Sequence, residues 1–186
     1  MALSSSAVAA QAMSNISGFD FNNPHNKSKE FIEAAAKGAV EVLQSDGLVI
    51  VNSHAGGSYG VTGVTQSSIE SKIKGYMSSF TFTGAHSKAG TQPKAVAKAV
   101  ADVVTSKAKV NVPTDSSGTF PILYVTAGDI KSGIESVYIA EGFKLGNEYC
   151  QSSKVIDALS TALADAITNG AKVAVNGVAG GSFRIV

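Results

Sequence analysis

The sequence is short of the side chains that mark several classes of protein. Its 186 residues include one cysteine, no tryptophan and only 16% charged residues. The single cysteine, Cys150, excludes an internal disulfide. Arg184 is the only arginine, and no cluster of lysines replaces the missing ones. We therefore expect no nucleic-acid partner, because such surfaces need clustered Lys and Arg.

Long apolar runs are also lacking. No stretch approaches the ~18 apolar residues of a membrane-spanning helix, so we expect no membrane span. Residues 1–12 include Ala10-Gln11-Ala12, but no Lys or Arg precedes them, which argues against a cleaved secretory signal. We expect synthesis in the cytoplasm without a signal peptide, and the final location stays open. No motif indicates a cofactor or a metal, so we assign neither.

Small apolar residues dominate what is present. The apolar fraction is 44%, and most of it is alanine and valine. Small side chains permit close packing, and a sparsely charged surface is typical of one that is covered by another molecule. This composition favours a protein that packs against copies of itself. The alternative is a stable monomer with an alanine-rich helical layer.

One stretch of the chain occurs three times, at Val49–Tyr59, Val110–Phe120 and Val173–Phe183. Each copy has a Val-x-Val, a polar turn, a glycine, a hydroxyl residue and an aromatic residue. The sequence numbers of equivalent positions differ by 61 (110 − 49) between the first two copies and by 63 (173 − 110) between the last two. We interpret this as an internal threefold repeat. The units span residues 1–63, 64–125 and 126–186 and together form one compact domain.

Each unit is expected to contain a helix, a strand, a helix and two strands. In the first unit, apolar spacing predicts helices over 4–17 and 29–44, and Phe19–Phe21 alternates like a strand. Phe80–Phe82 and Phe143–Leu145 match that alternation in the other units. The fold class is therefore mixed α+β, with three α-β-α-β-β repeats. A ring about a pseudo-threefold axis is favoured over a row, because neither end shows a polar capping unit.

The loops before the long helices carry the first candidate site. His25, His86 and Tyr149 occupy equivalent positions, since their numbers differ by the same two offsets (86 − 25 = 61 and 149 − 86 = 63). Cys150 follows Tyr149 directly. In a ring these loops would converge on the axis, where the side chains could bind an anion, coordinate a metal or relay a proton. The alternative is that they close each loop over a helix start by hydrogen bonding. No catalytic residue is assigned.

The turns after the Val-x-Val strands are the second candidate site. Their backbone N–H groups could cradle a phosphate, but no Walker pattern is present and no helix follows. Glycines that permit the turns are the favoured interpretation. The residues concerned are His54, Gly56, Gly57, Asp115, Gly118, Gly180 and Gly181.

Two functions are compatible with these patterns. The first is a structural protein that self-assembles into a particle, filament or sheet, with copies of itself as its partner. Its final strand would pair with the edge of a neighbouring chain; this strand contains Ser182, Phe183, Arg184, Ile185 and Val186. The second is a small-molecule-binding protein or enzyme with its site at His25, His86 and Tyr149. The scarcity of catalytic groups favours a protein that is not an enzyme.

Overall fold

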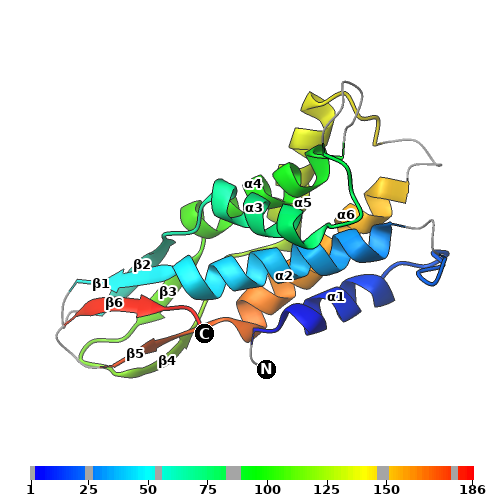
Figure 1. The fold of residues 1–186 in the computed structure, drawn as a ribbon. Coiled ribbons are helices and arrows are strands. Elements are labelled where there is room, and N and C mark those ends of the chain that lie inside the picture. Colours follow the sequence, from blue (N-terminus) through cyan, green and yellow to red (C-terminus); the bar gives the residue numbers. More distant parts are fainter. Residues whose placement is uncertain (1–2, 24–26, 53–55, 83–88, 146–150, 177–179) are drawn as a thin grey trace.

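The computed structural model describes residues 3–23, 27–52, 56–82, 89–145, 151–176 and 180–186. Within these ranges the chain forms six α-helices and two antiparallel sheets, which confirms the mixed α+β class. The helices lie side by side, and all the strands gather at one end of the helical layer (Figure 1).

The elements follow one another as helix, helix, strand and strand, and this order recurs along the chain. The first elements are α1 (Ser5–Ser14), α2 (Ser28–Asp46), β1 (Leu48–Val51) and β2 (Gly57–Thr62). Next come α3 (Gln66–Tyr76), α4 (Thr91–Ser106), β3 (Lys109–Val112) and β4 (Gly118–Pro121). The last are α5 (Ala127–Ala140), α6 (Gln151–Asp165), the π-helical turn η1 (Ala166–Gly170), β5 (Lys172–Val175) and β6 (Gly181–Arg184).

The predicted first strand of each unit is not a strand. Phe19–Phe21, Phe80–Phe82 and Phe143–Leu145 are turns or irregular chain. The rings of Phe19 and Phe21 lie 5.7 Å apart and pack half-buried against the core. The sheets form at the other end of the helices (Figure 1), so these segments have no strand to pair with. Alternating aromatic residues here indicate two rings on one apolar surface.

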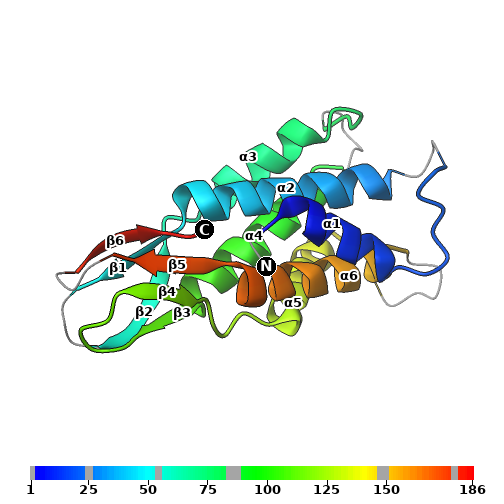
Figure 2. The same cartoon turned by 90° about the horizontal axis from the view of Figure 1, so that it is seen from below.

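The helices form a closed ring. Consecutive helices pack against each other, α6 packs back against α1, and α2 also contacts α4 and α6. Figure 2 shows α1 lying beside both α2 and α6. The buried faces of α2, α4 and α6 are rich in alanine, which lets the helices approach closely. The three shorter helices begin with capping side chains that accept a backbone N–H, namely those of Ser4, Thr65 and Thr126.

The two sheets are joined along both edges. One has the strand order β3-β2-β1-β6, and the other pairs β4 with β5. Lys109 in β3 bridges to Leu123, which follows β4, and Val173 in β5 bridges to Ile185, which follows β6. The edge strands of each sheet are thus hydrogen-bonded to those of the other. This joining protects edges that would otherwise be open to pairing with another chain.

Three strand pairs, β1–β6, β2–β3 and β4–β5, share the same register of a glycine opposite a valine. Gly57 lies opposite Val112, Gly118 opposite Val175, and Gly181 opposite Val51. The side chains on the inner face of the two sheets are all buried and form an apolar core. They belong to Val49, Val51, Val61, Val110, Val112, Ile122, Val173, Val175 and Ile185. Because strand residues alternate between faces, this Val-x-Val spacing fixes which face is inside.

The three glycines in these pairs lie under aromatic rings. A Cβ on Gly57 would be 3.1 Å from the ring of Tyr59, and one on Gly181 would be 3.2 Å from the ring of Phe183. At Gly118, the ring of Phe120 would be 3.6 Å away. The glycine therefore makes room for the ring two residues along, which covers the exposed backbone.

One glycine sets the distance between two helices. A Cβ on Gly38 in α2 would lie 2.7 Å from Cγ1 of Ile73 and 2.9 Å from its backbone nitrogen in α3. Backbone atoms cannot move aside as a flexible side chain can, so any larger residue must push the helices apart.

We predict opposite effects for two Gly-to-Ala substitutions. Gly38→Ala should lower the free energy of unfolding by about 1–3 kcal/mol through overpacking. Gly75→Ala, in α3 with open space around it, should raise it by roughly 0.5 kcal/mol through helix propensity. Urea unfolding of the two variants measures both values. Equal effects would show that α2 and α3 can separate without cost.

Candidate functional site

A cavity of about 280 Å³ opens among the N-terminal ends of α2, α4 and α6. We call it the axial cavity, and the following residues line it: Lys27, Ser28, Phe31, Phe80, Gln92, Tyr138, Gln151, Ser152 and Val155. Phe31, Gln92 and Val155 come from the three long helices, and their numbers differ by the two offsets of the predicted repeat (92 − 31 = 61 and 155 − 92 = 63). The N-terminal ends of α2, α4 and α6, which carry most of these lining residues, lie away from the strands (Figure 1).

Backbone donors at this end of the helices lack the caps found elsewhere. Within the described residues, no side chain caps α2, which begins after Lys27, or α4, which begins after Gly90. The first turn of a helix leaves N–H groups without intrahelical partners, and the helix dipole makes this end partially positive. With the ammonium of Lys27 beside them, these ends favour an anionic or hydrogen-bond-accepting group.

Gln92 places a buried polar atom at the cavity. Its Oε1 is buried and has no hydrogen-bond partner among the residues that the structure describes. A buried acceptor without a partner costs about 1–3 kcal/mol. A molecule in the cavity that offers a donor to Oε1 would recover that cost.

Aromatic rings form much of the remaining wall. Tyr138 is almost fully buried, and its ring lies 5.0 Å from that of Phe143. Phe80 stacks on Phe82 at 6.3 Å. The cavity therefore combines polar helix ends with apolar walls, as small-molecule sites generally do.

A nearby carboxylate is already engaged. Glu30, in the first turn of α2, accepts hydrogen bonds from the hydroxyl and from the backbone N–H of Ser79, the second at 2.9 Å. These bonds favour the ionised form and hold the pKa of Glu30 below its ordinary value of 4.5. Glu30 does not line the axial cavity.

The histidine-loop candidates are close in sequence to residues that line this cavity. His25, His86, Tyr149 and Cys150 are outside the described residues, as is His54. His25 precedes Lys27 by two positions, and Tyr149 precedes Gln151 by two. The prediction that these four residues form a site therefore stays a prediction.

The turn candidates lie at the other end of the molecule. Gly56 donates its N–H to Oγ1 of Thr114 at 3.2 Å. Asp115 and Gly180 have positive φ values of 52° and 80°, as tight turns require. Gly57, Gly118 and Gly181 begin strands β2, β4 and β6. The described turn residues are thus part of the strand end and do not line the axial cavity.

The proposed self-association strand is paired within the chain. Residues 181–184 form β6 and pair with β1. Val186 exchanges two backbone hydrogen bonds with Lys172, and Ile185 bridges to Val173. Pairing of this segment with another chain would compete with these bonds.

Sequence reasoning missed the residues that line the axial cavity. It placed candidate residues before the long helices but did not include Phe31, Gln92 or Tyr138. The numbers of Phe31, Gln92 and Val155 differ by the two offsets of the predicted repeat, and this signal in the first helical turns was not used. Nothing in the sequence indicates that Tyr138 reaches the same place.

Comparison with known proteins adds no functional information. No protein-family model, curated protein or solved structure matches the chain. Across the described ranges, no three His, Cys, Asp or Glu side chains lie close enough together to hold a metal ion. No helix in the same ranges is both long and apolar enough to cross a membrane.

Proposed function

We propose that the chain consists of three equivalent units, residues 1–63, 64–125 and 126–186, around a pseudo-threefold axis, and that it binds a small anionic molecule in the axial cavity. Both parts of the proposal are argued from residues whose numbers differ by 61 or 63, the two offsets of the repeat. The strand pairs that share one register and the three capped helices recur from one unit to the next. Such recurrence is typical of repeat architectures.

The start of the second unit provides a test of equivalence. Val64 corresponds to Leu3 (3 + 61), and both side chains are buried. Gly63 forms the turn before Val64, with φ of 85°. If the units are equivalent, the chain can begin at Val64 as readily as near Leu3.

We predict that a circular permutant folds when it begins at Val64, ends at Gly63 and joins the original termini through a short Gly-Ser linker. It should unfold cooperatively, with a melting temperature within about 10 °C of that of the original chain. The permutation opens one loop and closes another, and the helices and strands keep their contacts. Circular dichroism during heating measures this. A permutant opened between Ala97 and Lys98, inside α4, is the control and should lose most of its stability. Failure of the first permutant to fold would contradict equivalent units.

The observation that carries the binding proposal is the meeting of complementary polar groups around one cavity. Among the described residues, two helix starts without a side-chain cap and Lys27 provide donors, while Oε1 of Gln92 lacks one. Phe31 and Phe80 provide apolar wall. The chemistry that satisfies all three features is a small carboxylate with a hydroxyl group and an apolar or aromatic body.

We predict that 4-hydroxybenzoate raises the melting temperature of the full chain in a saturable manner. Benzoate should act more weakly, because it offers no donor to Gln92. A ligand present at 100 times its dissociation constant stabilises a fold by about 2.7 kcal/mol. Gln92→Leu should remove the preference for the hydroxyl group, and Lys27→Met should weaken both carboxylates.

Neutral 4-hydroxybenzyl alcohol is the matched control for the charge. Equal shifts with the alcohol and the acid would contradict an anion site. If none of acetate, lactate, benzoate and 4-hydroxybenzoate changes the melting temperature, the axial cavity is not a binding site for them.

Self-association is a second candidate function, favoured by one surface. Ile50, in the middle of β1, is 48% exposed, although its neighbours Val49 and Val51 are buried. Residues 48–62, which include β1 and β2, contain no Asp, Glu, Lys or Arg. An exposed isoleucine on two neighbouring strands that carry no charge, between Lys109 of β3 and Arg184 of β6 on the flanking strands, is suited to contact with a second copy of the chain. This mode of contact leaves the internal pairing of β6 intact.

We predict that the native mass measured by light scattering rises with protein concentration, and that Ile50→Lys abolishes the rise. The charged side chain would be buried without a partner in the contact. Ile139→Lys, at a position on α5 that is 63% exposed, is the matched control and should still associate. A monomer at every concentration would exclude self-association.

A further inference from the structure

A second cavity, of about 240 Å³, lies between α1 and the C-terminal end of α6. Figure 2 shows α1 along α6 near this end, and the two helices are in contact. We call it the α1–α6 cavity. Its lining residues are Ser4, Ala7, Val8 and Gln11 on one side, and Asp165, Ala166, Asn169 and Gly170 on the other.

The cavity is found where α1 carries a smaller side chain than its counterparts. Val8 corresponds to Ile69 in α3 (8 + 61) and to Ile130 in α5 (69 + 61). Both isoleucines are fully buried, in the helices that pack against α2 and α4. Val8 is shorter by one methylene group, which leaves space on the α1 side.

The chain on the other side of the cavity, at the end of α6, also carries a smaller side chain than its counterparts. Ala166 corresponds to Val103 (166 − 63) and to Val42 (103 − 61), which are both buried. The chain widens here into the π-helical turn η1, in which the N–H of Ala171 donates to the carbonyl of Ala166 at 2.9 Å. Two smaller side chains and a widened turn thus open the same interface.

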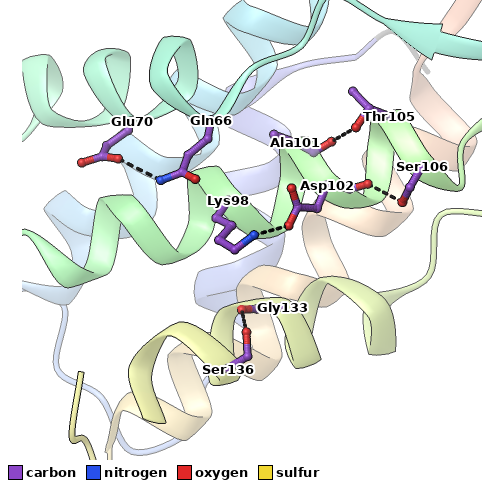
Figure 3. Close-up of polar contacts among 9 residues, drawn as sticks. All are labelled: Gln66, Glu70, Lys98, Ala101, Asp102, Thr105, Ser106, Gly133 and Ser136. Carbon is purple, nitrogen blue, oxygen red and sulfur yellow. Dashed lines mark hydrogen bonds and ion pairs between the residues drawn. The ribbon is translucent and has the colours of Figure 1, made fainter. Parts of the chain in front are cut away.

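A carboxylate faces this space without the cation that its counterparts have. Asp165 corresponds to Asp102 (165 − 63) and to Glu41 (102 − 61). Glu41 pairs with the ammonium of Lys72 at 3.4 Å. Asp102 pairs with Lys98 on its own helix, as Figure 3 shows.

At Asp165 the cation is replaced by an amide. Gln11 corresponds to Lys72 (11 + 61), and its Nε2 donates to Oδ2 of Asp165 at 2.6 Å. In the part of the chain that the structure describes, no Lys or Arg nitrogen pairs with Asp165. A partly buried carboxylate beside an open cavity attracts a cation, because few waters screen it.

We propose that the α1–α6 cavity binds a small primary alkylammonium ion. The ammonium group pairs with Asp165, in the role that Lys72 has for Glu41. The alkyl chain fills the space left at Val8 and Ala166. The size of the cavity and the single carboxylate suit a monoamine of about four carbons better than a long or doubly charged amine.

The first test is binding of n-butylammonium chloride to the full chain, by titration calorimetry and by thermal shift. The expected result is saturable binding and a rise in melting temperature that sodium chloride at the same ionic strength does not produce. The neutral probe n-butanol should bind at least about tenfold more weakly. Equal binding of the alcohol and the amine, or no binding of the amine, would overturn the proposal.

Variants of the cavity separate a specific site from general attraction. Gln11→Lys supplies an internal ammonium, as in the α2–α3 pair, and should reduce butylammonium affinity at least about tenfold while the chain stays folded. Ala166→Val refills the space and should do the same. Asp102→Asn removes an equivalent carboxylate elsewhere and should leave binding unchanged. Unchanged binding in Gln11→Lys and Ala166→Val would place the amine elsewhere and reject the site.

Discussion

The pairing of β1 with β6 is the interaction on which the rest of the structure depends. It joins residues 48–51 to residues 181–184 and so connects the first strand of the chain to the sixth. This closure is accompanied by bridges between the two sheets at both edges and by packing of α6 against α1. Both cavities lie between helices from distant parts of the chain. The α1–α6 cavity lies in the helical contact that accompanies the closure.

The sequence was most informative where side-chain spacing alone determines the element. Alanines and valines at helical spacing predicted a helix over 29–44, and α2 spans Ser28–Asp46. The Val-x-Val stretches were predicted to be strands, and β1, β3 and β5 are strands whose valines at these positions are buried while the residues between them are exposed or partly exposed. The prediction was wrong at Phe19–Phe21 because alternation says only that two side chains share a face. Strand formation also needs a neighbouring strand, and the fold places the strands elsewhere.

The candidate sites were less predictable, because they depend on distances between helices. His25 and His86, the candidates named from the sequence, lie outside the described residues, and Gln92 and Tyr138 were not recognised. Their proximity follows from how three helix ends converge, which no local pattern encodes. The numbers of Gln11 and Lys72 differ by the first offset of the predicted repeat (72 − 11 = 61), and the proposed amine site depends on this difference in side chain.

The register of β1 and β6 also has a consequence for synthesis on the ribosome. Leu48 pairs with Arg184, which the ribosome adds 136 residues later (184 − 48). Until then, the apolar edge of β1 has no partner from β6, while α2 and β2 are already available to it. The nascent chain must therefore hold an open strand edge while the residues between β1 and β6 are added, and the slow, long-range pairing that closes it follows the local pairing of β1 with β2. A ribosome that stalls before β6 emerges would present this edge to other nascent chains, so the four-stranded sheet links the synthesis of β6 to protection of β1 from aggregation.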